Sequence, residues 1–399
     1  MDTPFHRRGA ILGLALATSI FAGCDALSEP LATDLATAVD VPAAVAESQV
    51  DDAEAPFLRV LTRNIYLGGD TGPLFSTNFS DIPAVLAAVN GFWNQVQATD
   101  FQDRAEALAR EIAMTDPHVV ALQEVARYVL LDGTLTPTGM VDFLPVLQSA
   151  MADQGLDYRL EVRQDNTTGT LPLGFDLATL RPTLLLNFTV GEATLVRSDV
   201  DVLGTDQGNY AAMISIPTPL GPVEVQRGWS RVTLNHRGVP HHVVNTHLET
   251  QGLQPFHDLQ ADELLGSVLA GLEGVTVVMG DLNSDAEAVE GDRSWTATYG
   301  KFTGAGFVDA WTQAVGDTGV GYTCCHDPDL MNAASGLDER IDFVLVRTPS
   351  TQGGSILPGA VHMTVLGDEE GDRLASGLWP ADHAGLFAGL QLPRGFLTP

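Results

Sequence analysis

The order of apolar and polar positions beyond residue 56 predicts many short strands separated by a few helices. Short apolar runs and alternating apolar and polar residues are typical of strands, whereas apolar residues three or four positions apart are typical of helices. The predicted strands are residues 57–67, 119–125, 158–162, 184–188, 192–197, 223–233, 241–247, 275–279, 341–346 and 386–392. The predicted helices are residues 82–97, 101–114, 141–154 and 255–269.

This order of elements indicates a single domain over residues 57–399, a segment with no internal repeat and no linker in its sequence. Strand-rich stretches broken by a few helices suggest two packed sheets with the helices outside. Asp100 is the expected N-cap of the helix at 101–114, because aspartate accepts hydrogen bonds from the first backbone N–H groups of a helix. Residues 236–240 predict a turn between two strands.

The first 23 residues have the features of an export signal. Arg7 and Arg8 precede an uncharged, mostly apolar run at residues 10–22, which is too short for a comfortable membrane span. Small residues follow Phe21 and lead to Cys24, an ending that resembles a bacterial lipoprotein signal. Cys24 is therefore the predicted lipidation site, and the alternative is an ordinary secretory signal. A lipid would anchor the protein on the periplasmic or cell-surface side of a membrane.

Residues 24–56 have the composition of a flexible acidic tether, with eight acidic residues and no lysine or arginine. The whole chain carries 20 basic and 51 acidic residues, a net charge of −31, and Lys301 is its only lysine. Such a surface repels polyanions, so we expect no stable nucleic-acid complex held by charge alone. The net charge does not exclude phosphate chemistry at one local site, because a divalent cation can supply the positive charge there.

Two further cysteines, Cys324 and Cys325, are adjacent in the sequence. In an oxidising compartment they could form a vicinal disulfide, and the alternative is a pair of thiols. A metal site is less favoured, because adjacent side chains of an extended segment point apart.

Polar side chains recur at the ends of the apolar strands. A carboxylate in an apolar strand is costly unless it is paired or binds a metal. If these strand ends meet at one edge, they form a pocket of carboxylate, amide and imidazole groups, which are the parts needed for metal-assisted phosphoester hydrolysis. The residues are Asn64, Glu124, His247, Asp281, Asn283, Asp342, Asp382 and His383.

Six short motifs that contain these residues resemble, in order, those of the endonuclease/exonuclease/phosphatase superfamily, which includes DNase I-like nucleases, abasic-site endonucleases, neutral sphingomyelinases and inositol polyphosphate phosphatases. The resemblance spans about residues 57–392 and implies a four-layer α/β sandwich with two central, mostly antiparallel sheets. The motifs are Thr62-Arg63-Asn64-Ile65, Gln123-Glu124-Val125, Asn245-Thr246-His247-Leu248, Gly280-Asp281-Leu282-Asn283, Arg340-Ile341-Asp342 and Asp382-His383.

The resemblance implies a Mg²⁺ cofactor, with Mn²⁺ or Ca²⁺ as alternatives. Glu124 would be its main ligand, supported by Asn64 and Asp382. His383 would be the general base or would orient the attacking water, and Asp342 would fix its tautomer.

The remaining residues would act on the phosphate. Asp281 and Asn283 would position the nucleophile and the phosphate or help the leaving group, and His247 would stabilise the transition state. The carboxylate that supports this histidine in DNase I-like members has no clear counterpart, and Asp176 and Glu192 are the candidates. Arg227 is a candidate for an additional substrate contact.

Each residue taken singly has a simpler explanation. Asn64 could cap a turn, Glu124 could pair with Arg127, and Asp342 could pair with Arg340. Six such coincidences at strand ends make these explanations improbable when they are taken together. Phe307 and Trp311 are better explained as core anchors than as substrate contacts.

The sequence therefore predicts an exported, monomeric, metal-dependent phosphoesterase with a phosphate-ester substrate. A nucleic acid or nucleotide is the default substrate, and a phospholipid head group, as for a sphingomyelinase-like phosphodiesterase, is the second. The alternative of another class is a non-catalytic surface-binding lipoprotein that retains the fold.

Overall fold

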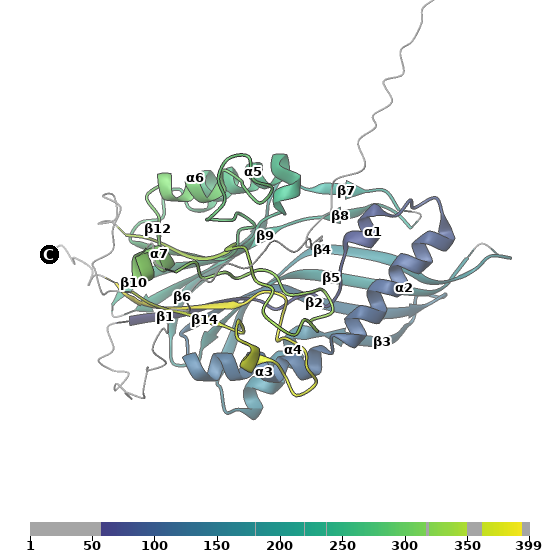
Figure 1. The fold of residues 1–399 in the computed structure, drawn as a ribbon, viewed down its shortest axis with the longest axis horizontal. Helices are drawn as coiled ribbons and strands as arrows, with labels where there is room; N and C mark the ends of the chain where they lie inside the picture. Colours follow the sequence, from purple (N-terminus) through teal and green to yellow (C-terminus); the bar gives the residue numbers. More distant parts are fainter. Residues whose placement is uncertain are drawn as a thin grey trace, which may run out of the picture.

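A computed structural model describes residues 57–179, 181–218, 220–236, 238–316, 319–348 and 361–392. The predicted signal segment at residues 1–23, the tether at 24–56 and Cys24 lie outside these ranges. In the described part, two β-sheets pack face to face and helices cover their outer faces (Figure 1). This arrangement confirms the predicted four-layer sandwich.

The larger sheet contains nine strands, of which β1 and β2 pair in parallel and the rest are antiparallel. Its order is β14 (Val361–Leu366), β15 (Gly385–Gln391), β1 (Phe57–Asn64), β2 (Val119–Asp132), β5 (Arg181–Arg197), β4 (Tyr158–Asp176), β8 (Val223–Val225) and β7 (Ile214–Ile216), with β3 (Pro137–Asp142) paired to β2.

The smaller sheet contains six strands, and here β10 and β11 form the parallel pair. Its order is β12 (Val308–Asp309), β13 (Asp342–Arg347), β11 (Val275–Asp281), β10 (Val239–His247), β9 (Gly228–His236) and β6 (Asp201–Asn209). Each sheet thus holds one parallel pair, and the carboxyl ends of two parallel strands lie at the same edge of their sheet.

Apolar side chains form three layers around and between the sheets. The core between the sheets includes Val60, Val119, Val243, Val277 and Val344. The outer face of the larger sheet packs on α2 (Ile82–Ala98), α3 (Phe101–Thr115) and α4 (Phe143–Asp153), and α1 (Gly72–Ser76) packs on α2. The outer face of the smaller sheet packs on α5 (Gln254–Glu263), the π-helical turn η2 (Leu264–Val268) and α6 (Thr298–Gly304).

The remaining helical elements are short. They are α7 (Ala310–Val315) and the 3₁₀ turns η1 (Gln251–Leu253) and η5 (Glu370–Asp372). Phe307 and Trp311 pack on the apolar cores, as the sequence predicts. Among the described residues, no helix has both the length and the apolar character that a bilayer span requires.

Aspartate side chains cap three of the helices, α2, α4 and α7, whereas α1, α3, α5 and α6 have no side-chain cap. Asp81 and Asp142 accept hydrogen bonds from Ala84 N and Leu144 N and so cap α2 and α4. Asp100 lies at the predicted N-cap of α3, but its side chain makes no capping hydrogen bond. The predicted position is therefore correct and the predicted interaction is wrong.

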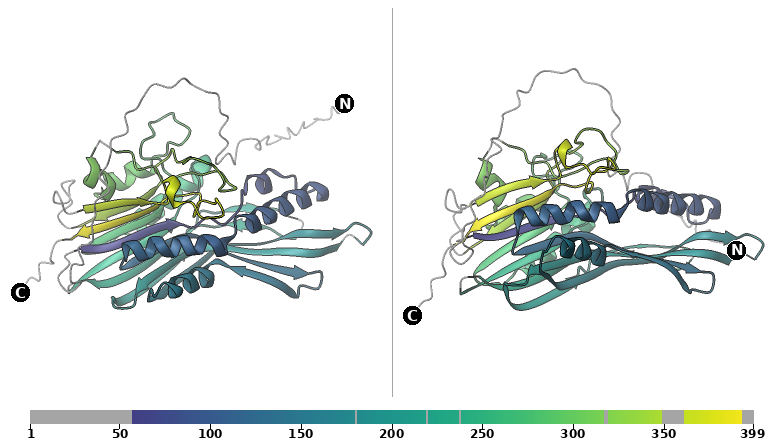
Figure 2. Two further views of the ribbon diagram at one scale, coloured as in Figure 1. Left: turned by 60° about the horizontal axis from the view of Figure 1, so that its bottom comes forward. Right: turned by 90° about the horizontal axis from the view of Figure 1, so that it is seen from below.

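The longest strands exceed the prediction. β4 and β5 pair as one long hairpin where three short strands are predicted, and β2 extends seven residues past the predicted end at 125. The β4–β5 and β2–β3 hairpins project beyond the rest of the molecule (Figure 2). Residues 163–170 of β4 are all polar or glycine, and Thr168 among them contacts the hydroxyl of Thr189 on β5, so this part of the sequence lacks the apolar pattern of a strand.

Other differences come from short or divided elements. The predicted strand at 223–233 is split at Gln226 and Arg227 into β8 and β9, which belong to different sheets. The predicted helix at 141–154 begins only at Phe143, because the preceding residues form β3. Elements absent from the prediction are α1, α6, α7, β3, β6, β7, β12 and β14.

Gly280 offers a test of the packing at the end of β11. Its φ is +139°, and an added Cβ would overlap the carbonyl oxygen of Thr246 on β10. We expect Gly280→Ala to lower the free energy of unfolding by more than about 2 kcal/mol, measured by urea denaturation. The control is Gly91→Ala on the exposed face of α2, where an added Cβ meets open space. This change should raise the free energy of unfolding by roughly 0.5–1 kcal/mol. Equal stability of the two variants would contradict the described packing.

Candidate active site

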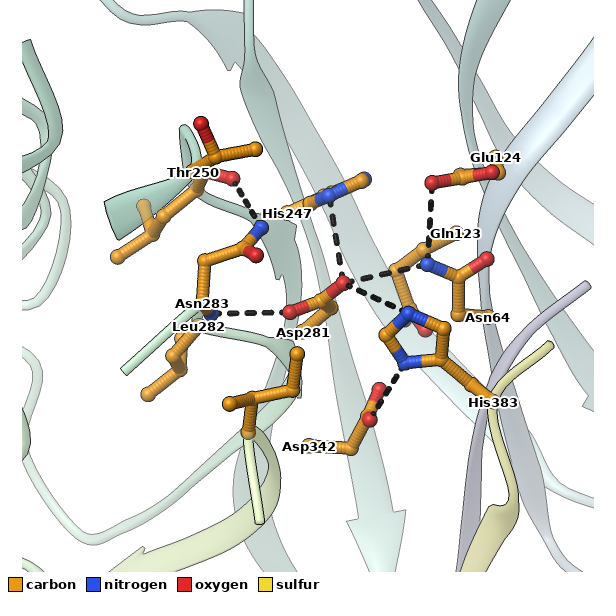
Figure 3. A network of polar contacts seen from close by, with 12 residues as sticks. Asn64, Gln123, Glu124, His247, Thr250, Asp281, Leu282, Asn283, Asp342 and His383 are labelled. Atoms are coloured by element: carbon orange, nitrogen blue, oxygen red, sulfur yellow. Dashed lines mark hydrogen bonds and ion pairs between the residues drawn. The ribbon is translucent and has the colours of Figure 1, made fainter. Parts of the chain in front are cut away.

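The predicted site residues gather where strands of both sheets end. The parallel pairs place Asn64 opposite Gln123 and His247 opposite Asp281, and the β11–β13 pair places Asp281 opposite Asp342. Figure 3 shows the side chains grouped around the Asp281 carboxylate. The group comprises Asn64, Glu124, His247, Asp281, Asn283, Asp342 and His383.

Asn64 joins the two sheets. Its Nδ2 donates to Glu124 Oε1 on the larger sheet and to Asp281 Oδ2 on the smaller sheet, both at 3.2 Å. Its Oδ1 accepts from Tyr66 N at 3.0 Å, which fixes the orientation of the amide. Glu124 lies at a register shift in β2, has a φ of +57° and accepts from Leu67 N at 2.8 Å. Both side chains are therefore held by several bonds before any ligand binds.

His383 and Asp342 form a buried pair, with 2.8 Å between Nδ1 and Asp342 Oδ2. The other ring nitrogen, Nε2, lies 3.8 Å from Asp281 Oδ2. Burial alone would lower the pKa of His383, but the negative charges of Asp342, Asp281 and Asp382 raise it well above its ordinary value. Burial and the nearby Asp342 raise the pKa of Asp281 to about 7. Three carboxylates, those of Asp281, Asp342 and Asp382, thus favour a proton on the His383 imidazole.

His247 has an unexpected partner. Arg227 Nη1 lies 3.1 Å from both of its ring nitrogens, and the same guanidinium binds Glu249, with Nη2 to Oε1 at 3.1 Å. Burial, Arg227 and His383 together lower the pKa of His247 well below its ordinary value. The imidazole is therefore neutral and lies between the Arg227 cation and Asp281, whose Oδ2 is 3.4 Å from its Nε2.

The two carboxylates predicted to support His247 do not contact it. Asp176 lies at the tip of the β4–β5 hairpin, where it accepts from Ala178 N. Glu192 is buried and accepts from Asn166 Nδ2, and burial raises its pKa to about 8. Sequence reasoning missed Glu249, although its position two residues after His247 places both side chains on one face of an extended segment.

Asn283 is held on the loop after β11. Its backbone N–H donates to Asp281 Oδ1 at 2.9 Å, and its Nδ2 donates to Leu248 O at 3.0 Å. Its φ of +47° is one that asparagine adopts more readily than most residues. The amide is buried beside Asp281, as the motif predicts.

The donor set suits a hard cation. Asp382 Oδ1 is buried and has no hydrogen-bond partner among the described residues. Burial raises the pKa of Asp382 to about 7, and Glu124 adds to the rise while His383 opposes it. Carboxylate oxygens are ligands that Mg²⁺ prefers, so Glu124 and Asp382 fit the implied metal, whereas Asn64 turns its Nδ2 toward Glu124 and its Oδ1 toward Tyr66 N.

Two buried arginines fix the backbone that carries these ligands. Arg104 Nη1 donates to Ile65 O at 2.7 Å and to Pro380 O at 3.1 Å, which ties the end of β1 to the loop before β15. Arg63 pairs with Glu111 at 2.9 Å and donates to His383 O. Neither arginine is predicted as a site residue, because an arginine on a strand or a helix has no distinguishing sequence signal.

The simpler pairings considered from the sequence do not occur. Arg127 pairs with Asp165 and not with Glu124. Arg340 pairs with Asp309 at 2.6 Å and with Glu287 at 3.2 Å, and not with Asp342. Glu124 and Asp342 are thus available to the site.

Cys324 and Cys325 form a disulfide, which is one of the two alternatives open from the sequence. Their side chains therefore do not point apart, contrary to the expectation for an extended segment.

The fold and the site together define a hydrolase that acts on phosphate esters. A sequence model described as the Endonuclease/Exonuclease/phosphatase family matches residues 89–383, about three quarters of the chain. This protein belongs to that family. The matched range contains all the predicted site residues except Asn64 and Cys24.

The fold is also similar to solved structures. D. rerio TDP2, humanized by 14 mutations, is 18% identical, with 84% of this chain and 99% of that chain covered and a TM-score of 0.46. An endonuclease/exonuclease/phosphatase family protein from Leptotrichia buccalis is 16% identical, with coverage of 84% and 100% and a TM-score of 0.49. The corresponding protein from Beutenbergia cavernae is 20% identical, with coverage of 84% and 72% and a TM-score of 0.45. A comparison with curated proteins gives no significant match.

The Arg227–Glu249 pair predicts a stability effect. Arg227→Gln leaves the Glu249 carboxylate buried without its cation, so we expect a loss of about 3–5 kcal/mol in the free energy of unfolding. Arg227→Gln combined with Glu249→Gln should lose less than the sum of the single variants, measured by urea denaturation. The control is Arg127→Gln, whose partly exposed pair with Asp165 is worth at most about 1 kcal/mol. Additive losses in the double variant would show that Arg227 and Glu249 are not coupled.

Proposed function

We propose that this protein is a metal-dependent phosphoesterase that cleaves its substrate by in-line attack of water on phosphorus. The observation that carries the proposal is the seam between the sheets, where Asn64 bonds both Glu124 and Asp281, Asp281 lies 3.8 Å from His383, and Asp382 keeps a buried Oδ1 without a hydrogen-bond partner among the described residues. A bound Mg²⁺ ion would polarise a non-bridging phosphate oxygen and offset charge on the leaving oxygen.

The residues of the chain supply the proton transfer. The His383–Asp281 pair, with 3.8 Å between Nε2 and Oδ2, accepts the proton of the attacking water. Asp342 holds Nδ1 of His383, so that Nε2 is the nitrogen directed toward Asp281. The charges of Asp281 and His383 affect each other's pKa, and the proton is therefore assigned to the pair and not to one residue.

The other side of the site stabilises charge on the phosphate. His247 is neutral and can donate one N–H to a phosphoryl oxygen, while Arg227 behind it supplies the positive charge. Asn283 uses one N–H of its amide to bind Leu248 O and has a second for the substrate. Arg227 thus acts mainly by positioning His247.

The proposed substrate is a phosphodiester or phosphomonoester, with a nucleic acid or nucleotide as the default. The charge of the protein does not favour a stable complex with a long nucleic acid. Residues 57–399 carry most of the negative charge, and arginines such as Arg163 and Arg231 are paired with aspartates. We further propose that the protein is a monomer, is exported and is anchored to a membrane by a lipid on Cys24. Such a location would also suit a phospholipid substrate.

Hydrolysis by the purified protein tests this function. Bis-p-nitrophenyl phosphate, p-nitrophenyl phosphate, plasmid DNA and sphingomyelin are assayed with Mg²⁺, Mn²⁺, Ca²⁺ or EDTA. We expect EDTA to abolish turnover, Glu124→Gln to lower it by about 10³-fold or more, and His383→Ala to lower it by roughly 10²–10⁴-fold. Glu124→Gln should keep its melting temperature within a few degrees of the original, because glutamine has the size of glutamate. His383→Ala should lower the melting temperature, because Asp342 loses its buried partner, so its turnover is measured at a temperature where the variant is shown to be folded.

Matched controls are Glu106→Gln and His362→Ala, which change exposed residues outside the site and should keep turnover within about twofold. Hydrolysis that survives EDTA or the Glu124→Gln change would contradict the metal site. A folded protein with no turnover on any of these substrates would favour the surface-binding alternative.

A further inference from the structure

The Cys324–Cys325 pair lies directly against the His383 imidazole. A ring nitrogen of His383 and the two Sγ atoms all lie within 4.8 Å of one another. Cys324 is 3% exposed, whereas Cys325 is partly exposed to solvent. The proposed hydrolytic mechanism uses neither sulfur.

Backbone bonds hold this loop beside His383 independently of the sulfurs. Cys324 pairs with His383 in an antiparallel bridge. The backbone N–H of Ala384 donates to Thr323 O, and that of His326 donates to Asp382 O, both at 2.8 Å. Reduction of the disulfide would therefore leave two thiols in place next to the imidazole.

Two thiolates and an imidazole prefer a different metal from the oxygen ligands of Glu124 and Asp382. Thiolate sulfur and histidine nitrogen bind Zn²⁺ tightly, whereas Mg²⁺ prefers oxygen. Asp342 already binds one ring nitrogen of His383 at 2.8 Å, which is the arrangement that orients zinc-binding histidines. The imidazole that serves proton transfer in the proposed mechanism is thus also a donor suited to zinc.

We propose that Cys324, Cys325 and His383 form a zinc site when the disulfide is reduced, and that zinc bound there withdraws His383 from hydrolysis. A dithiol reductant transfers two electrons and two protons to the disulfide and becomes a disulfide itself. Zn²⁺ then displaces the two thiol protons and binds both sulfurs and the imidazole. Zinc capture does not depend on the proposed function, whereas the inhibition rests on it.

Zinc binding to the purified protein is measured by competition with a chromophoric chelator, in a Cys24→Ser background so that only one cysteine pair is present. We expect one Zn²⁺ per chain after reduction and at least tenfold weaker binding in the oxidised protein. Zinc binding should also be at least tenfold weaker in the reduced Cys324→Ser/Cys325→Ser variant and in His383→Ala. The exposed residue His362 provides the matched control, and His362→Ala should bind zinc like the unmodified protein. Alkylation and mass spectrometry verify the number of thiols.

Inhibition is measured on the same samples. For each protein, the turnover rate with zinc is divided by the turnover rate of that protein without zinc. One equivalent of Zn²⁺ should lower turnover by at least tenfold in the reduced protein and by less than twofold in the oxidised protein. Equal zinc affinity in the oxidised protein or in the double serine variant would overturn the site. Zinc binding without inhibition would overturn the inhibitory role. If the protein hydrolyses none of the substrates, the proposed function fails, and the zinc affinities still decide the site.

Discussion

The energetic cost of burying charged side chains determines how the residues around the candidate active site are arranged. A charge removed from water is stable only when it is paired or fully hydrogen-bonded. Arg63 pairs with Glu111, Arg340 pairs with Asp309, and Arg104 donates to four backbone carbonyl oxygens. The carboxylates nearest His383 are compensated less completely, since Asp382 keeps a buried oxygen without a hydrogen bond. A cation at this point would complete the compensation.

The two sheets contribute equally to the site, which therefore exists only when they are packed together. Asn64 and Glu124 come from the larger sheet, whereas His247 and Asp281 come from the smaller sheet. The buried Asn64 amide bridges them, and Gln123 and Asn245 form a second buried bridge at 2.7 Å. Packing of the valine-rich core between the sheets thus sets the geometry of the catalytic groups.

The sequence predicts this part of the molecule well because residues at the ends of apolar strands are easy to locate. Parallel neighbours carry Asn64, His247 and Asp281 to common edges, and the motifs identify them. The long β4–β5 hairpin is harder to predict, because residues 163–170 of β4 are all polar or glycine and give no apolar pattern. Arg104 acts through contacts between distant segments, so no local pattern reveals its role. Glu249 lies two residues after His247, but its link to that histidine runs through the distant Arg227.

Direct binding of Mn²⁺, followed by electron paramagnetic resonance, tests the central claim that the incompletely compensated carboxylates form a cation site. The account predicts saturable binding that Mg²⁺ competes away and that weakens at least tenfold in Asp382→Asn. The exposed hairpin residue Asp176 supplies the control, and Asp176→Asn should bind Mn²⁺ like the unmodified protein. Equal Mn²⁺ affinity in Asp382→Asn and the unmodified protein, or no saturable binding at all, would contradict the account.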